Sequence, residues 1–516
     1  MKKFIAPLLV GAALTSAFGA DESLKQEIEA LKAQMAELKS AQAKVNVEAL
    51  KNQLSEVKAH DSGDNIKWTA DLRTSYDAVE YKINGASNEK NGLWTNRLIL
   101  GMSSQPADNL VFKGSLGVYS MFGNNSSTGM NPYSNMNWYS SESPDDNSVR
   151  LREAYFLYFG NMGDVPYTVS FGRRPSVDGF LTNLRNDNEN PASPIGHNIN
   201  MEFDGASFKF DLDKVTGVSG MYFKICLGRG NSNADAKYPT FTGYPIMGGV
   251  MPSATQTPYA KTDSDSANMD LAGLIFQAYD NGQYKVMANL FKGWNMMGAN
   301  FSYAGATANH NNNLMDNFDS FGNFLGYNVA MTDVGDLTGG ALSLQVNGIG
   351  DGISDFLDDS IFFLSYAFSK TDPKGAHNII VDNMGTIGTT SEMLGSHDSQ
   401  TGSSIYTGVQ VPGVMKGQRL GLEYNHGSKY WRSFTYGEDT LVGSKLAARG
   451  DAYELYYILP IVGKNLTAQL SYIYIDYDYT GSDMFFGSTG TPMDVDTTPG
   501  AVKTAQNVRA SLRYRY

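Results

Sequence analysis

Cysteine is almost missing from this chain, and its absence excludes several kinds of site. The 516 residues include one cysteine, Cys226, and six histidines. One thiol forms no intrachain disulfide, and no cluster of Cys and His residues is available to bind zinc. A Cys-x-x-Cys-His motif for haem attachment is missing as well. We therefore expect no metal and no other cofactor. An isolated cysteine is typical of an oxidising compartment.

Long apolar runs and a basic excess are also missing. No run of about 18 apolar residues occurs, which excludes ordinary transmembrane helices. Acidic residues outnumber basic ones by 53 to 40, and the net charge of −13 argues against nucleic acid as a partner. The chain is instead rich in glycine (54), tyrosine (30) and phenylalanine (26). This composition is compatible with a membrane β-barrel, whose alternating strands keep the average hydropathy low.

The first 19 residues predict a secretory signal peptide. Lys2 and Lys3 precede an apolar run at residues 4–17, and Ala17-Phe18-Gly19 has the small-x-small pattern of a cleavage site. No cysteine lies near this site to carry a lipid anchor. We therefore expect the mature chain to leave the cytoplasm.

Residues 20–60 predict a short α-helical coiled coil in the periplasm. They contain no glycine or proline, and Lys and Glu separate apolar residues spaced alternately by four and three. These apolar residues are Leu24, Ile28, Leu31, Met35 and Leu38. This apolar repeat breaks near Gln42 and restarts in a shifted frame at Val47, as it does at a stutter in a coiled coil. A small bundle, such as a trimer, and a single solvated helix both fit this pattern.

Residues 61–516 predict an all-β fold, a transmembrane antiparallel β-barrel of about 16 strands, with 14 to 18 compatible with the pattern. Sixteen segments of about 9 to 14 residues show partial polar–apolar alternation, and one of them is expected to begin near residue 429. Short turns are expected at 280–282, 426–428 and 462–464. Longer polar stretches are expected at 122–148, 175–199, 229–267, 294–337, 371–416 and 480–504. Tight periplasmic turns alternating with long outer loops are typical of bacterial outer-membrane barrels.

The last nine residues alternate between two faces. Val508, Ala510, Leu512, Tyr514 and Tyr516 share one face, and Arg509, Ser511, Arg513 and Arg515 share the other. A bilayer offers no water to unpaired backbone groups, so the last strand is expected to pair with the first and close the sheet. The tyrosines then lie in the periplasmic aromatic girdle, and the arginines face the lumen.

The terminal segment, with Leu512, Tyr514 and Tyr516 at alternate positions, resembles the insertion signal that the barrel-assembly machinery reads. The signal peptide, coiled coil and barrel, together with segments 149–155 and 171–175, resemble a group of porin-like proteobacterial proteins of unassigned function. This resemblance implies a place in the bacterial outer membrane, but no substrate. The partners expected there are outer-membrane lipids, lipopolysaccharide and the assembly machinery, and a homotrimer is also expected.

Charged residues on three strands and one loop predict a pore constriction. Alternation points Arg150, Arg152 and Arg174 into the lumen, with Arg152 and Arg174 paired across the ladder. The third long loop, 175–199, resembles by position the loop that narrows sixteen-stranded porins. Its acidic residues are Asp178, Asp187 and Glu189, and Arg509 and Arg513 form a second basic stripe. The alternative is that these arginines only solvate the interior or contact lipopolysaccharide.

The residue that breaks the expected alternation is Glu153. The pattern points it towards lipid, where a charge is costly, so it indicates a bulge, a register error or a subunit contact. The same alternation places Tyr155 and Leu157 outward and Phe156 and Tyr158 inward.

The function expected from these features is a passive diffusion channel for small hydrophilic solutes or ions, with anions favoured. One alternative is a structural tether that reaches peptidoglycan through the coiled coil. Another is a hydrolase that uses His197 or His397. Ser396-His397-Asp398 has the residue types of a catalytic triad, but adjacent side chains cannot converge, so we expect no enzyme. The acidic clusters at 263–265 and 351–359 lack the spacing of a calcium loop.

Overall fold

The computed structural model describes residues 66–121, 149–174, 177–188, 190–232, 243–246, 249–252, 268–303, 326–350, 352–381, 386–435, 438–482 and 490–516. The signal peptide and coiled coil predicted for residues 1–60, and Glu189, lie outside these ranges.

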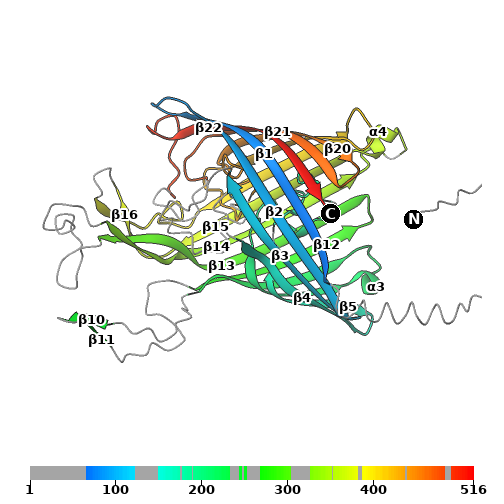
Figure 1. Cartoon of the computed structure of the whole chain (residues 1–516), viewed down its shortest axis with the longest axis horizontal. Coiled ribbons are helices and arrows are strands. Elements are labelled where there is room, and N and C mark those ends of the chain that lie inside the picture. Colours follow the sequence, from blue (N-terminus) through cyan, green and yellow to red (C-terminus); the bar gives the residue numbers. More distant parts are fainter. Residues whose placement is uncertain are drawn as a thin grey trace, which may run out of the picture. The chain divides into compact units, whose positions relative to one another are not determined.

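Sixteen strands of the described residues form one closed antiparallel barrel (Figure 1). In barrel order these are β1 (Lys67–Ile83), β2 (Glu89–Ala107), β3 (Leu110–Met121), β4 (Arg150–Met162), β5 (Val165–Arg174), β8 (Phe203–Asp211), β9 (Tyr222–Asn231), β12 (Met269–Asp280), β13 (Tyr284–Tyr303), β14 (Tyr327–Asn347), β15 (Ile361–Pro373), β18 (Thr401–Pro412), β19 (Arg419–Gly427), β20 (Gly450–Val462), β21 (Leu466–Tyr477) and β22 (Val502–Arg515). The blue β1 lies beside the red β22 in Figure 1, and Thr74 pairs with Leu512 across this seam. The predicted fold class and closure are confirmed.

Short elements complete the described chain. Three two-stranded pairs lie outside the barrel sheet: β6 (Gly179–Phe180) with β7 (Ala192–Ile195), β10 (Gly243–Ile246) with β11 (Gly249–Pro252), and β16 (His377–Ile380) with β17 (Ile387–Thr390). The helices α3 (Asp213–Thr216) and α4 (Asp355–Asp358) each span four residues. No helix in the described part of the chain has the length and apolar run needed to cross a membrane.

The connections at the two ends of the barrel differ in length. At the end where β1 begins and β22 ends, short turns such as 163–164, 281–283 and 463–465 join the strands. We call this the short-turn end. At the opposite end, the connections include residues 175–202, 374–400 and 428–449. This arrangement agrees with the predicted alternation of tight turns and long loops.

Two strand predictions are wrong, and their errors cancel in the strand count. A strand was expected to start near residue 429 after a turn at 426–428, but residues 428–449 form a long connection between β19 and β20. Conversely, β18 lies within the stretch 371–416 that was expected to be a loop. Gly402 and Gly408 of β18 suggest a loop in the sequence, but neither position in the barrel wall has space for a side chain. A Cβ at Gly402 would collide with the backbone of residues 430–431, and one at Gly408 would lie 2.5 Å from Phe363 Cζ.

The exterior of the barrel is apolar. Many outward leucines are more than 40% exposed, among them Leu72, Leu227, Leu290, Leu342, Leu364, Leu470 and Leu512. Aromatic side chains such as Tyr76 and Trp94 pack against each other on the same surface, with ring centroids 5.1 Å apart. A closed sheet leaves no strand edge unpaired, and an apolar outer band suits lipid acyl chains. The chain is an outer-membrane β-barrel.

A β-bulge in β4 explains Glu153. Ser115 of β3 pairs with Glu153, but the next residue, Leu116, pairs with Leu151, so Arg152 is inserted without an opposite residue. Arg152 and Glu153 therefore both face the interior, where they line the same cavity. Of the three explanations considered for Glu153, the bulge is confirmed.

The bulge also reverses the alternation that follows it in β4. Phe156 and Tyr158 are exposed on the outer surface, where the Phe156 ring stacks on Phe171. The Tyr155 ring lies on the lumen side under the Arg174 guanidinium. The sequence-based orientations of Tyr155, Phe156 and Tyr158 were wrong because a bulge shifts the two-residue period by one.

Two connections fold into the lumen. The first inner segment (residues 177–188 and 190–202) buries Phe180, Leu181 and Ile195, and the second inner segment (residues 428–435 and 438–449) buries Trp431 and Leu446. The segments also pair with each other through two backbone hydrogen bonds. The Asn200 N–H donates to the Phe434 carbonyl, and the Phe434 N–H donates to the Asn198 carbonyl. Together they fill part of the barrel.

Candidate pore site

A buried ion cluster joins the two inner segments to the wall. It consists of Arg185 from the first segment, Glu438 and Lys445 from the second, and Glu423 and Glu454 from β19 and β20. Arg185 lies 3.2 Å from Glu423 and 2.6 Å from Glu438, and Lys445 contacts both Glu423 and Glu454. Burial lowers the pKa of Arg185, but the nearby glutamates, led by Glu438, raise it well above its usual value. Removing Arg185 or Lys445 would therefore leave three buried glutamates with a single basic group between them.

A second group of charges, the seam cluster, lies where the barrel closes. Its members are Asp71, Arg73 and Asp77 of β1, Arg97 of β2, Arg509 and Arg513 of β22, and Asp439 of the second inner segment. The Asp439 carboxylate contacts Arg73, Arg97 at 3.1 Å and Arg509 at 3.0 Å. Burial raises the pKa of Asp439, but the three guanidinium groups together lower it by more, so the pKa lies well below its usual value.

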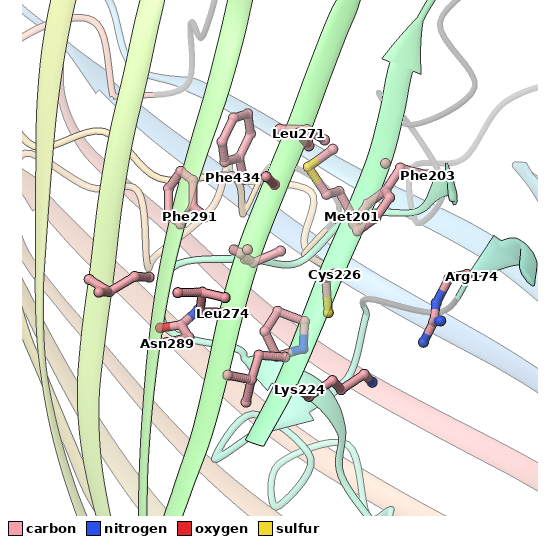
Figure 2. A pocket seen from close by; sticks show the side chains of 17 residues that line it. Arg174, Met201, Phe203, Lys224, Cys226, Leu271, Leu274, Asn289, Phe291 and Phe434 are labelled. Carbon is pink, nitrogen blue, oxygen red and sulfur yellow. The ribbon is translucent and has the colours of Figure 1, made fainter. Parts of the chain in front are cut away.

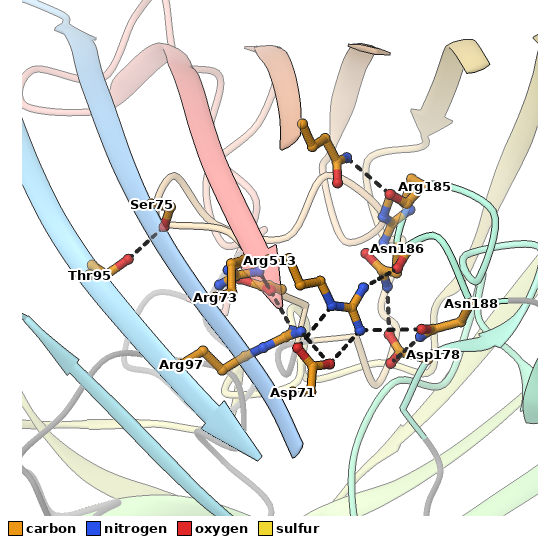
Figure 3. Close-up of polar contacts among 12 residues, drawn as sticks. Asp71, Arg73, Ser75, Thr95, Arg97, Asp178, Arg185, Asn186, Asn188 and Arg513 are labelled. Atoms are coloured by element: carbon orange, nitrogen blue, oxygen red, sulfur yellow. Dashed lines mark hydrogen bonds and ion pairs between the residues drawn. The ribbon is translucent and has the colours of Figure 1, made fainter. Parts of the chain in front are cut away.

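Arg513 connects the seam cluster to the first inner segment (Figure 3). Its guanidinium pairs with Asp71 and donates to the Asn186 carbonyl at 2.6 Å. Asn186 and Asn188 in turn donate to the Asp178 carboxylate, at 2.5 and 2.9 Å. The loop acid Asp178 therefore faces asparagines of its own loop rather than a wall arginine.

The remaining predicted residues are spread over different parts of the lumen. Asp187 pairs with Arg515 at the end of β22. Arg152 pairs with Glu202 at 3.1 Å, and Arg150 is exposed at the start of β4. Arg174 donates to the hydroxyl groups of Ser170 and Ser207. The expected ladder pair of Arg152 and Arg174 is wrong, because the β4–β5 register ends at Ala154 and Arg173 and the bulge displaces Arg152.

Several charged residues of the site were missed from the sequence. The first strand offers a signal that could have identified three of them, since Asp71, Arg73 and Asp77 share one face while Leu72 and Tyr76 lie on the other. Arg185, Asp439 and Lys445 carry no such signal, because they lie on irregular segments. Arg185 and Asp439 have partners hundreds of residues away, and Lys445 pairs with residues of two barrel strands.

Two cavities remain beside the first inner segment. The vestibule, of about 1260 Å³, opens among turns of the short-turn end such as 280–282 and 463–465. The side passage, of about 470 Å³, lies along β1–β4 and the end of β22. Asn188, Arg515 and Tyr516 line both cavities, so the two adjoin. The side passage is lined by the basic residues Lys67, Lys113, Arg152, Arg513 and Arg515 and the acidic residues Asp71 and Glu153. The vestibule is lined by the basic residues Lys285, Lys416, Arg419, Lys464 and Arg515 and the acidic residues Asp187 and Asp280.

Comparison with known protein families gives one assignment. The model of the family described as "Protein of unknown function (DUF3373)" matches residues 87–516. The chain belongs to this family. No curated protein matches the chain.

Among solved structures, the DUF3373 barrel resembles an anion-selective porin from Comamonas acidovorans, with a TM-score of 0.44 and 11% identity over 88% of this chain and 99% of the other. It also resembles OprB of Pseudomonas putida, with a TM-score of 0.43 and 12% identity over 90% and 96% of the two chains. OmpT of Vibrio cholerae gives a TM-score of 0.41 and 12% identity over 87% and 97%. At this level of similarity, the function of the DUF3373 chain has to be inferred from its own side chains.

His197 and His397, the two histidines considered for catalysis, have different surroundings in this DUF3373 barrel. The His197 ring lies between the hydroxyl groups of Ser365 and Ser404, at 2.8 and 2.9 Å, and is fully buried, so no substrate reaches it. Burial lowers its pKa to about 3, despite a hydrogen bond with Asn425, so the ring is neutral. His397 is exposed beside Glu392 and Asp398. Within the described ranges, no group of three or more His, Cys, Asp or Glu residues could hold a metal ion.

Proposed function

We propose that the barrel is a passive diffusion channel for small hydrophilic solutes and ions, and that anions pass more readily than cations. The observation that carries this proposal is the pair of adjoining cavities beside the first inner segment, because each has five basic and two acidic lining residues. Solutes would enter the vestibule and move along the β1–β4 wall past Arg152 and Arg513. Rings of charged side chains select ions in pores.

The local charge along this route decides the preference for anions. The chain as a whole carries −13, but a solute in the side passage is close to three more positive than negative side chains. A low-dielectric wall concentrates the field of such charges, so the lining matters more than the total charge. The constriction role of Arg152, Asp187 and Arg513 belongs to this proposal.

Recording from purified protein in planar bilayers tests the proposal. Under a salt gradient, the reversal potential should indicate anion preference, and the double variant Arg152→Gln and Arg513→Gln should reduce it. Lys214→Gln removes one positive charge from α3, away from either cavity lining, and should leave the reversal potential unchanged. A double variant with the wild-type reversal potential would refute the assignment of the route, and protein without conducting steps would refute the channel itself.

A structural role is the second candidate, favoured by the buried ion cluster that holds both inner segments inside the barrel. A barrel filled in this way could act as an outer-membrane tether, with the N-terminal segment reaching peptidoglycan. The absence of conducting steps would favour this candidate. We also propose that the barrel forms a homotrimer and that it contacts lipopolysaccharide and the assembly machinery. Cross-linking in native envelopes tests the trimer.

A further inference from the structure

We propose that the lumen wall contains a binding pocket for a small carboxylate with a short apolar tail. The pocket lies in the wall of β9, β12 and β13, under residues of both inner segments, and encloses about 40 Å³. Figure 2 shows Arg174 and Lys224 on one side of the pocket and Phe291 and Phe434 on the other. None of its lining residues lines the vestibule or the side passage. The site is therefore separate from the proposed route and does not depend on conduction.

The basic side of the pocket has the chemistry of an anion site. Arg174 is 8% exposed, and the partners of its guanidinium are the hydroxyl groups of Ser170 and Ser207 and the Tyr155 ring. No carboxylate of the described residues pairs with Arg174. A buried guanidinium that lacks a counter-charge is costly, and a bound carboxylate would supply one.

Neighbouring strands add to the positive charge. Lys209 of β8 is directly opposite Lys224 of β9, and both face the lumen. Opposite like charges destabilise a sheet unless a counter-charge is near. Asp211 lies 2.6 Å from Lys209 and pairs with that lysine. Together with Arg174, the three basic groups favour an anionic ligand.

The apolar side of the pocket determines the class of anion. Met201, Leu271, Phe291 and Phe434 form its lining, and Gly273 leaves the hollow open. A Cβ at Gly273 would make only ordinary contacts, the nearest with the Leu290 carbonyl oxygen at 3.5 Å, so a small group can be placed beside this glycine without a collision. A simple inorganic anion would make no use of these side chains, while the small volume excludes a long chain. A carboxylate with a tail of a few carbons would pair with the basic side of the pocket and pack its tail against the apolar side.

Isothermal titration of the whole chain in neutral detergent tests this proposal, with butanoate as the probe. Butanoate should bind saturably, and more tightly than acetate, which lacks the tail, or butan-1-ol, which lacks the charge. Arg174→Gln should weaken butanoate binding about tenfold or more, the effect of losing a charged hydrogen bond. Gly273→Val should weaken it as well, because the side chain fills the hollow with ordinary contacts.

Controls separate a local effect from misfolding and from failure of the channel. Lys214→Gln should bind butanoate like the wild type, and Arg174→Lys should retain part of the affinity. Circular dichroism checks that each variant is folded. The pocket is refuted if butanoate does not bind saturably, if acetate binds equally well, or if Arg174→Gln and Gly273→Val both bind normally. Protein that conducts ions without binding butanoate would refute the pocket and leave the channel proposal standing.

Discussion

Replacing Asp439 with asparagine tests how the second inner segment is held to the barrel seam. The Asp439 carboxylate contacts three arginines, Arg73, Arg97 and Arg509, which belong to β1, β2 and β22. Asparagine keeps nearly the same shape but removes the negative charge. The substitution therefore changes the electrostatics of the seam cluster and leaves its packing close to unchanged.

The expected loss of stability follows from which arginines keep a partner. Arg97 retains Asp71 at 3.2 Å, and Arg509 retains Asp77 at 2.6 Å. Arg73 loses the carboxylate with which it makes both of its hydrogen bonds. Breaking a buried ion pair from one side costs about 3–5 kcal/mol, and one orphaned guanidinium out of three indicates the lower end of this range, about 3 kcal/mol.

Urea unfolding in lipid vesicles, followed by tryptophan fluorescence, measures this loss. Asp398→Asn is a matched control, because it makes the same change at a side chain that is 77% exposed, and it should alter the free energy of unfolding by less than about 0.5 kcal/mol. Asp439→Asn with an equally small effect would refute the reasoning. In that case, the inner segment would be held by its apolar contacts alone.

Three further predictions concern the same interior. Gly408→Val should lower the free energy of unfolding by about 1–3 kcal/mol because its Cβ would lie 2.5 Å from the Phe363 ring, whereas Gly273→Val, whose Cβ would make only ordinary contacts, should lower it less; urea unfolding compares them. Trp431→Ala should cost about 3–5 kcal/mol in the same assay, since this side chain is buried and its indole N–H donates to the Leu446 carbonyl at 2.7 Å. The lowered pKa of Asp439 stabilises the folded state above the unfolded pKa of about 3.8, and this contribution is lost as the pH falls through the folded value. The free energy of unfolding, measured from pH 7 down to pH 3, should therefore fall less steeply in Asp439→Asn than in the wild type. Equal dependence on pH in the two proteins would contradict a stabilising role for the Asp439 carboxylate.

The sequence could predict the wall of the barrel because the wall follows a period of two. In β22, the alternation of Leu512 and Tyr514 with Arg513 correctly gave both the exposed face and the face that meets β1 charges. The same period failed in β4, where the bulge at Arg152 adds a residue that only the misplaced charge of Glu153 marked in the sequence. Strand number was right because the error at residue 429 balanced the missed β18.

The inner segments could not be predicted from local pattern. Residues 429–435 include three aromatic side chains and were expected to begin a strand, yet Trp431 and Phe434 are buried inside the barrel against wall residues such as Phe291. Their surroundings come from distant strands, and a linear pattern does not distinguish burial in the lumen from contact with lipid. For the same reason, the loop acids Asp178 and Asp187 were assigned to the lumen by resemblance, while their partners were not foreseen.

The two charge clusters explain how an acidic chain can have a basic route. The seam cluster sets four arginines against three aspartates, and the buried ion cluster sets two basic groups against three glutamates, so the two together are neutral. Two clusters that are neutral in sum contribute little to the net sign of the field along the route. That sign depends on lining residues that belong to neither cluster, such as Lys67, Lys113 and Arg515. It follows that substitutions at these three residues should alter ion preference with little loss of stability, whereas substitutions within the clusters, such as Arg513→Gln, should also lower stability, because a cluster charge is held by several close partners.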